Sequence, residues 1–132
     1  MAGTRWQPDA ALRAIASATR GLRLLVLHGS RARGDAHERS DWDFAYEGDG
    51  ELDPDGLLAA LVEHLKADRV DLTDLGRAGA LFRYRVARDG VVVFESDAGR
   101  FDGFRLDAVH TWCDLQPVLE PAYERLLQAL PR

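Results

Sequence analysis

Two aspartates separated by one residue, Asp41 and Asp43, could bind a divalent cation. Side chains alternate along a strand, so both carboxylates are expected on one face, while Trp42 and Phe44 point from the other face into the core. Because Trp42 and Phe44 are expected to be buried, the alternative interpretation, in which the two aspartates lie on a solvated strand edge, is disfavoured. Two neighbouring carboxylates repel each other unless a cation lies between them, and hard oxygen ligands of this kind suit Mg²⁺.

A third carboxylate, Asp71, follows in a later apolar segment. Its side chain is expected to point away from the core, opposite to its neighbours Val70 and Leu72. If this segment pairs with the strand that carries the first two aspartates, Asp71 completes a triad. Asp74 is the alternative, but it shares its face with the apolar neighbours and fits better as a cap before Gly76.

Upstream, Gly29-Ser30 lies where an apolar segment ends and a helix-forming tripeptide begins. Glycine lets the backbone approach a phosphate closely, a helix N-terminus offers free N–H groups, and Ser30 adds a hydroxyl. The pair could therefore hold the distal phosphates of a nucleoside triphosphate, with the carboxylates and their metal at the α phosphate. Arg31 and Arg33 are candidates for further phosphate contacts, although solvated side chains are an equally good interpretation.

The combination is more specific than its parts. The chain contains 15 Asp, and Asp53-Pro54-Asp55 repeats the D-x-D pattern, so that pattern alone carries little weight. A Gly-Ser pair ten residues before D-x-D is expected by chance in only about 0.5% of such chains.

The composition bounds the kind of protein. The 132 residues are 46% hydrophobic and 30% charged, which predicts one globular domain, residues 1–132. A net charge of −5 argues against a protein that coats nucleic acid. The single Cys excludes an internal disulfide, and the apolar runs are too short to span a membrane. A cytoplasmic protein is therefore expected.

The apolar pattern predicts the elements that position these residues. Strands are expected over 22–28, 41–46, 70–75 and 91–95, and helices over 8–19, 53–68 and 78–87. Two more helices, 98–114 and 118–130, are expected on either side of Pro117. By default the apolar stripe of the last helix packs on the domain, with docking of a partner as the alternative. The fold class is α/β (α+β), with a small mixed sheet of about four strands and a helical C-terminus.

Gly29-Ser30, ten residues, then Asp41-x-Asp43, with a later Arg69-Val70-Asp71-Leu72, resembles the DNA polymerase β-type nucleotidyltransferase superfamily. The size, the run from Gly29 to Gly34 and the segment 82–90 more narrowly resemble the minimal nucleotidyltransferases, the antitoxins of HEPN/MNT toxin–antitoxin pairs. His28 stands where such proteins often carry an apolar or aromatic residue.

The resemblance implies the nucleotidyltransferase fold and a protein adenylyltransferase with two Mg²⁺ ions. Such an enzyme would transfer AMP from ATP to a tyrosine of a cognate HEPN ribonuclease toxin, with which it would form a hetero-oligomer. The triad Asp41, Asp43 and Asp71 would bind the metals, and Asp71 would help to deprotonate the acceptor hydroxyl. Two alternatives stay open: an antitoxin that inhibits by binding alone, and an enzyme that modifies a small molecule such as an aminoglycoside.

Overall fold

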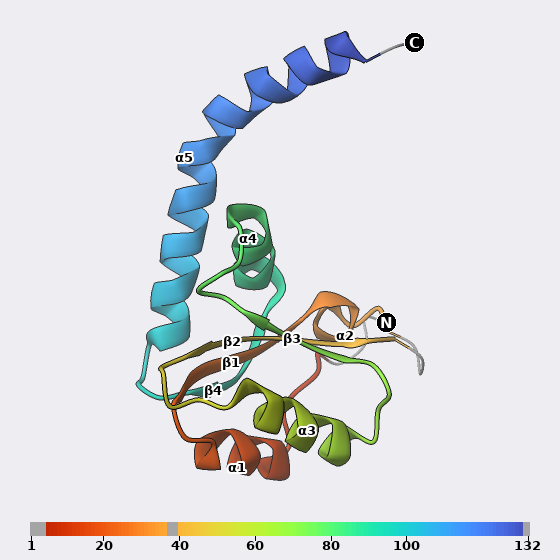
Figure 1. Ribbon diagram of the computed structural model, residues 1–132, viewed down its shortest axis with the longest axis vertical. Helices are drawn as coiled ribbons and strands as arrows, with labels where there is room; N and C mark the ends of the chain where they lie inside the picture. Colours follow the sequence, from red (N-terminus) through yellow and green to blue (C-terminus); the bar gives the residue numbers. More distant parts are fainter. Residues whose placement is uncertain (1–4, 37–39, 131–132) are drawn as a thin grey trace.

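The computed structural model describes residues 5–36 and 40–130, which form a four-stranded mixed sheet with helices on both faces (Figure 1). The strand order is β3-β2-β1-β4, in which β2 and β3 are parallel and the other neighbours are antiparallel. The predicted mixed α/β class is confirmed. In chain order the elements are α1 (Ala10–Ala18), β1 (Leu22–His28), α2 (Gly29–Arg33), β2 (Trp42–Gly48), α3 (Pro54–Leu65), β3 (Val70–Asp74), α4 (Ala80–Asp89), β4 (Val91–Glu95) and α5 (Arg100–Ala129).

The core lies on both faces of the sheet. In β1, Leu25 and Leu27 pack in the layer that contains α1 and α3, whereas Leu24 and Val26 pack in the layer that contains α4 and the start of α5 (Figure 1). A strand that is buried on both faces needs apolar residues at nearly every position, which explains the continuous apolar run of β1. This central strand ends at His28, directly before Gly29, so the Gly-Ser pair is anchored to the best-packed part of the sheet.

The helix α3 is shorter than predicted, because it ends at Leu65 rather than near residue 68. Lys66 adopts the left-handed conformation with φ of 51°, which terminates the helix and turns the chain towards β3. The carbonyl of Arg69 then accepts a hydrogen bond of 2.9 Å from the backbone N–H of Trp42. This early turn starts the β2–β3 pairing just before Asp71.

The prediction of two C-terminal helices was wrong, because α5 continues through Pro117 and Pro121 as one helix of 30 residues. A proline removes one helical hydrogen bond, which ends a helix where the freed carbonyl cannot reach another partner. Here the distal half of α5 projects away from the body and bends (Figure 1), so water can reach the backbone. No helix in the described part of the chain is long and apolar enough to cross a membrane.

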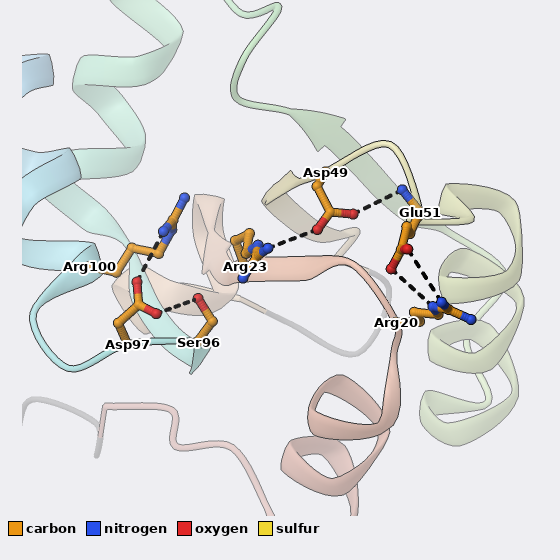
Figure 2. Close-up of polar contacts among 7 residues, drawn as sticks. All are labelled: Arg20, Arg23, Asp49, Glu51, Ser96, Asp97 and Arg100. Carbon is orange, nitrogen blue, oxygen red and sulfur yellow. Dashed lines mark hydrogen bonds and ion pairs between the residues drawn. The ribbon is translucent and has the colours of Figure 1, made fainter.

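Several arginines form ion pairs at the end of the sheet where β1 begins (Figure 2). Arg20 lies 3.0 Å from Glu51, and Arg23 lies 2.9 Å from Asp49. Figure 2 also shows Arg100 on α5, which is 3.1 Å from Asp97. Exposed pairs of this kind contribute only about 0–1 kcal/mol each.

Candidate active site

Three carboxylates converge at the end of the sheet where β2 and β3 begin. The two strands are parallel and place Asp43 opposite Asp71, while Asp41 immediately precedes β2. One carboxylate oxygen from each residue lies within 4.8 Å of the others. Asp41 and Asp43 are half-buried and Asp71 is exposed. The strand pairing on which the triad depended is therefore confirmed, and one member of the cluster faces solvent.

The structure also decides between Asp71 and Asp74 as the third carboxylate of the cluster. Asp74 accepts a hydrogen bond of 2.8 Å from the backbone N–H of Gly76, so it caps the turn that follows β3. Asp74 pairs with Tyr46 at the far end of the β2–β3 ladder, three residues from the pair formed by Asp43 and Asp71. The carboxylate in the cluster is Asp71.

The electrostatics of the cluster favour a cation. Burial, followed by the charges of Asp71 and Asp41, raises the pKa of Asp43 above its usual range. Two arginines compensate part of this charge: Arg69 forms an exposed ion pair of 3.8 Å with Asp41, and the charge of Arg33 lowers the pKa of Asp43 by less than the two carboxylates raise it. Three hard carboxylate donors whose negative charge is only partly compensated fit Mg²⁺. Asp41, Asp43 and Asp71 are thus able to hold such ions.

The raised pKa of Asp43 predicts how stability depends on pH. The folded state binds this proton more tightly than the unfolded state, so the metal-free protein loses stability as the pH rises from the unfolded to the folded pKa. Asp43→Asn removes the titrating carboxyl and with it this loss of stability. We expect the variant to be more stable than the wild type at pH 7 in EDTA and equally stable below the unfolded pKa.

Thermal denaturation across this pH range, with and without Mg²⁺, tests the expectation. Adding Mg²⁺ should stabilise the wild type more than Asp43→Asn. Asp114→Asn on the exposed part of α5 serves as the control and should show neither effect. A variant at position 43 that is less stable than the wild type at pH 7 without metal would contradict the electrostatic interpretation.

Gly29 is in direct contact with the cluster. Its φ is 76°, in the left-handed region that favours glycine, and a Cβ built on it would collide with the Oδ2 atom of Asp43. Ser30 follows in the first turn of α2, which ends at Gly34 with a backbone hydrogen bond of 3.1 Å to the Ser30 carbonyl. The predicted phosphate loop and the predicted metal ligands therefore form one continuous surface.

The two predicted arginines point to different places. Arg31 donates to the carbonyl of Ser40 at 2.8 and 3.1 Å and lies over the ring of Trp42 at 4.1 Å, so it holds the segment before β2. Arg33 instead lines a pocket of about 400 Å³ together with Gly29. The structure thus brings Arg33 to the candidate site, whereas the nucleotide contact of Arg31 stays a prediction.

The remaining wall residues of this pocket were not predicted to belong to the site, although His28 and the segment 82–90 entered the comparison with the minimal nucleotidyltransferases. His28 and Phe82 form an edge-to-face pair with ring centroids 5.1 Å apart. Burial lowers the pKa of His28, and its Nε2 has no hydrogen-bond partner within the described residues. Arg85 and Arg88 of α4 complete the lining. Their spacing of three residues predicts that they lie on one face of a helix, but only the packing of α4 against α2 brings that face to the site.

A Gly-Ser loop and three converging carboxylates on a mixed sheet define the nucleotidyltransferase class. Residues 11–99 match the family described as "Polymerase beta, Nucleotidyltransferase". The chain belongs to this family, and it is a nucleotidyltransferase. The resemblance to the DNA polymerase β-type superfamily is confirmed, and the match spans every residue of the candidate site.

Similar proteins extend the likeness beyond the matched segment. The protein adenylyltransferase MntA of Aphanizomenon flos-aquae (strain 2012/KM1/D3) is 29% identical over 123 residues, which cover 84% of this chain and 82% of the relative. A toxin–antitoxin structure with AMP-PNP has a TM-score of 0.71 at 22% identity, and covers 89% of this chain and 95% of that one.

A further solved structure contains a tri-AMPylated Shewanella oneidensis HEPN toxin in complex with an MNT antitoxin. It aligns with a TM-score of 0.63 at 22% identity, over 82% of this chain and 85% of that chain. At such identities the solved structures establish a shared fold. They confirm the predicted nucleotidyltransferase fold for this chain.

Proposed function

We propose that this chain is a magnesium-dependent protein adenylyltransferase that transfers AMP from ATP to a tyrosine hydroxyl of a HEPN ribonuclease toxin. The observation that carries the proposal is the contact between Gly29 and the carboxylate of Asp43 in a polymerase β-type nucleotidyltransferase. The adenylyltransferase name of the relative and the AMP-PNP and AMPylated-toxin complexes of the structural neighbours support ATP as donor and a toxin as acceptor.

The residues divide between the metals and the triphosphate. Asp41, Asp43 and Asp71 would hold two Mg²⁺ ions, which when bound neutralise charge on the α phosphate. Gly29 and Ser30 would bind the distal phosphates through backbone N–H groups and the serine hydroxyl, and Gly29 allows the close approach. This division leaves the α phosphate between the loop and the carboxylates, which is where transfer needs it.

The exposed carboxylate gives Asp71 its role towards the acceptor. Transfer forms a bond from the tyrosine oxygen to the α phosphorus and breaks the bond to the β-phosphate oxygen, so pyrophosphate leaves. The hydroxyl proton must be removed as the new bond forms. Asp71 is the only member of the triad that is exposed, so it can reach an acceptor from solvent and take this proton.

The distal half of α5 supplies a surface for a protein partner. The expectation that its apolar stripe packs on the domain was wrong, because Tyr123, Leu126, Leu127 and Leu130 are exposed. An apolar stripe at helical spacing on a projecting helix is typical of a docking surface. We propose that the toxin binds this stripe, which would bring its tyrosine to the carboxylates.

Truncating the chain after Gln116 tests this surface. The core ends at Ala108, so we expect the truncated protein to fold and to bind ATP with unchanged affinity. Transfer to the toxin should fall at least tenfold because the partner is no longer held near the site. Leu126→Glu with Leu127→Glu is a second test that keeps the helix length. Full transfer by both variants would rule out this docking surface.

Turnover distinguishes an enzyme from an antitoxin that acts by occlusion. With ATP and Mg²⁺, a substoichiometric amount of this protein should inactivate an excess of its HEPN ribonuclease toxin. Without ATP the ribonuclease should stay active at the same ratio. Stoichiometric inhibition that needs no ATP would contradict the proposed function and favour the binding-only alternative.

A further inference from the structure

The pocket beside the carboxylates carries more positive charge than its acids neutralise. Arg33 from α2 and Arg85 and Arg88 from α4 line it, and one acidic residue, Asp89, lies among them. The pocket shares Gly29 with the candidate phosphate loop, and its wall residue His28 pairs with Asp43 in the β1–β2 ladder. The cationic wall therefore adjoins the carboxylates on the side of α4.

Asp89 fixes two of these cations in place. Arg88 donates to both carboxylate oxygens of Asp89 at 2.9 Å, and a guanidinium nitrogen of Arg33 lies 3.7 Å from the same carboxylate. The hydrogen bonds from Arg88 lower the pKa of Asp89, so this residue stays ionised and keeps the two guanidinium groups together. Arg33 and Arg88 come from different helices, which makes the cluster a feature of the fold.

Arg85 differs from its neighbours because it pairs with no acid within residues 5–36 and 40–130. It is exposed, it lies one helical turn before Arg88, and it lines the same pocket. By contrast, Arg83 on the same helix is held by the carbonyl of Leu75 at 2.6 Å and by Asp107 at 3.2 Å. An exposed guanidinium that lines one pocket with two others, while Asp89 is the one acid lining it, can bind a further anion.

The position of the pocket selects the kind of anion. If the α phosphate of the nucleotide lies at the carboxylates, its β and γ phosphates must continue past Gly29, which opens into this pocket. Guanidinium groups suit phosphate oxygens because their planar fork donates two parallel hydrogen bonds. The pyrophosphate released by transfer carries the same oxygens, so the same wall would bind it before release.

We infer that Arg85, supported by Arg33 and Arg88, binds the distal phosphates of the nucleoside triphosphate and stabilises the pyrophosphate as it leaves. This inference rests on the proposed function and adds α4 to the phosphate-binding elements. Asp89 acts as a positioning residue, because it orders two cations while a third stays available for the ligand.

The test compares ligands that contain or lack distal phosphates. Calorimetry in Mg²⁺ buffer should show that Arg85→Gln weakens binding of ATP and inorganic tripolyphosphate at least tenfold, the loss expected for a charged hydrogen bond. The affinity for AMP should not change. Arg85→Lys should recover part of the loss because it keeps the charge. Arg77→Gln, at the opposite end of β3 and highly exposed, is the matched control and should bind as the wild type does.

The possible outcomes distinguish a failure of the inference from a failure of the proposed function. Equal ATP affinity in the wild type and Arg85→Gln would overturn the inference and leave the adenylyltransferase intact. An equal loss for AMP and ATP would also overturn it, because a structural defect does not distinguish the phosphates. Wild-type protein that binds tripolyphosphate through Arg85 but fails to bind ATP would keep the phosphate site and contradict the proposed function.

Discussion

Asp41→Asn and Asp43→Asn are each expected to abolish transfer of labelled AMP to the partner, with a loss of at least about 10³-fold. In the proposed function the carboxylates would hold metals whose charge stabilises the transferred adenylyl group by several kcal/mol, and about 1.4 kcal/mol corresponds to tenfold in rate. Labelling with α-³²P-ATP in Mg²⁺ buffer measures the loss. Removing divalent metal with EDTA should reproduce it in the wild type.

The fold should survive both substitutions, because they remove repulsion among the carboxylates rather than packing. Cooperative thermal unfolding of each variant verifies this. Asp74→Asn is the control: it lies on the same strand as Asp71 but caps a turn outside the cluster, so it should retain transfer. Wild-type rates in either Asp41→Asn or Asp43→Asn would sink the assignment of the triad.

Gly29→Val is expected to eliminate measurable ATP binding and to lower the free energy of unfolding by about 1–3 kcal/mol. The backbone there is left-handed, and the new side chain would displace the Asp43 carboxylate while it obstructs the phosphates. Ser30→Ala keeps the backbone contact and loses one hydrogen bond to a charged group, which predicts about 10- to 100-fold weaker ATP binding. At saturating ATP its transfer rate should stay near that of the wild type.

Gly34→Val is a control that distinguishes backbone strain from obstruction of the phosphate site. Gly34 has a φ of 85°, but a Cβ built there meets no atom within 4 Å. This control should therefore lose stability as Gly29→Val does and still bind ATP. Calorimetry on the three variants gives the comparison. If Ser30→Ala and Gly29→Val both bind ATP as tightly as the wild type, the loop does not hold the triphosphate.

Local patterns were sufficient for the parts of the site that lie on strands. The alternation around Asp43 and the apolar run of β1 predicted which side chains face the core and which face away from it. The strands β1 and β4 begin and end at the predicted residues. Asp71 could be assigned because a strand has only two faces and Val70 and Leu72 needed the buried one. Its distance from the other carboxylates required the parallel pairing of β2 with β3.

Features set by contacts between elements were beyond the sequence pattern. The direction of the Arg31 side chain is set by the ring of Trp42 and the carbonyl of Ser40, which only the folded chain places next to α2. Arg85 reaches the pocket because α4 packs against α2. The continuation of α5 through Pro117 depends on its projection into solvent, which local propensity does not encode.

The intact mass of the proposed HEPN partner tests the central claim most directly. After incubation with a substoichiometric amount of this protein, ATP and Mg²⁺, we expect the partner to gain mass in steps of one AMP, and peptide mapping should place the modification on tyrosine. The same incubation with Asp43→Asn should leave the mass unchanged. A partner that is fully inhibited by the wild-type protein without any gain in mass would contradict the account.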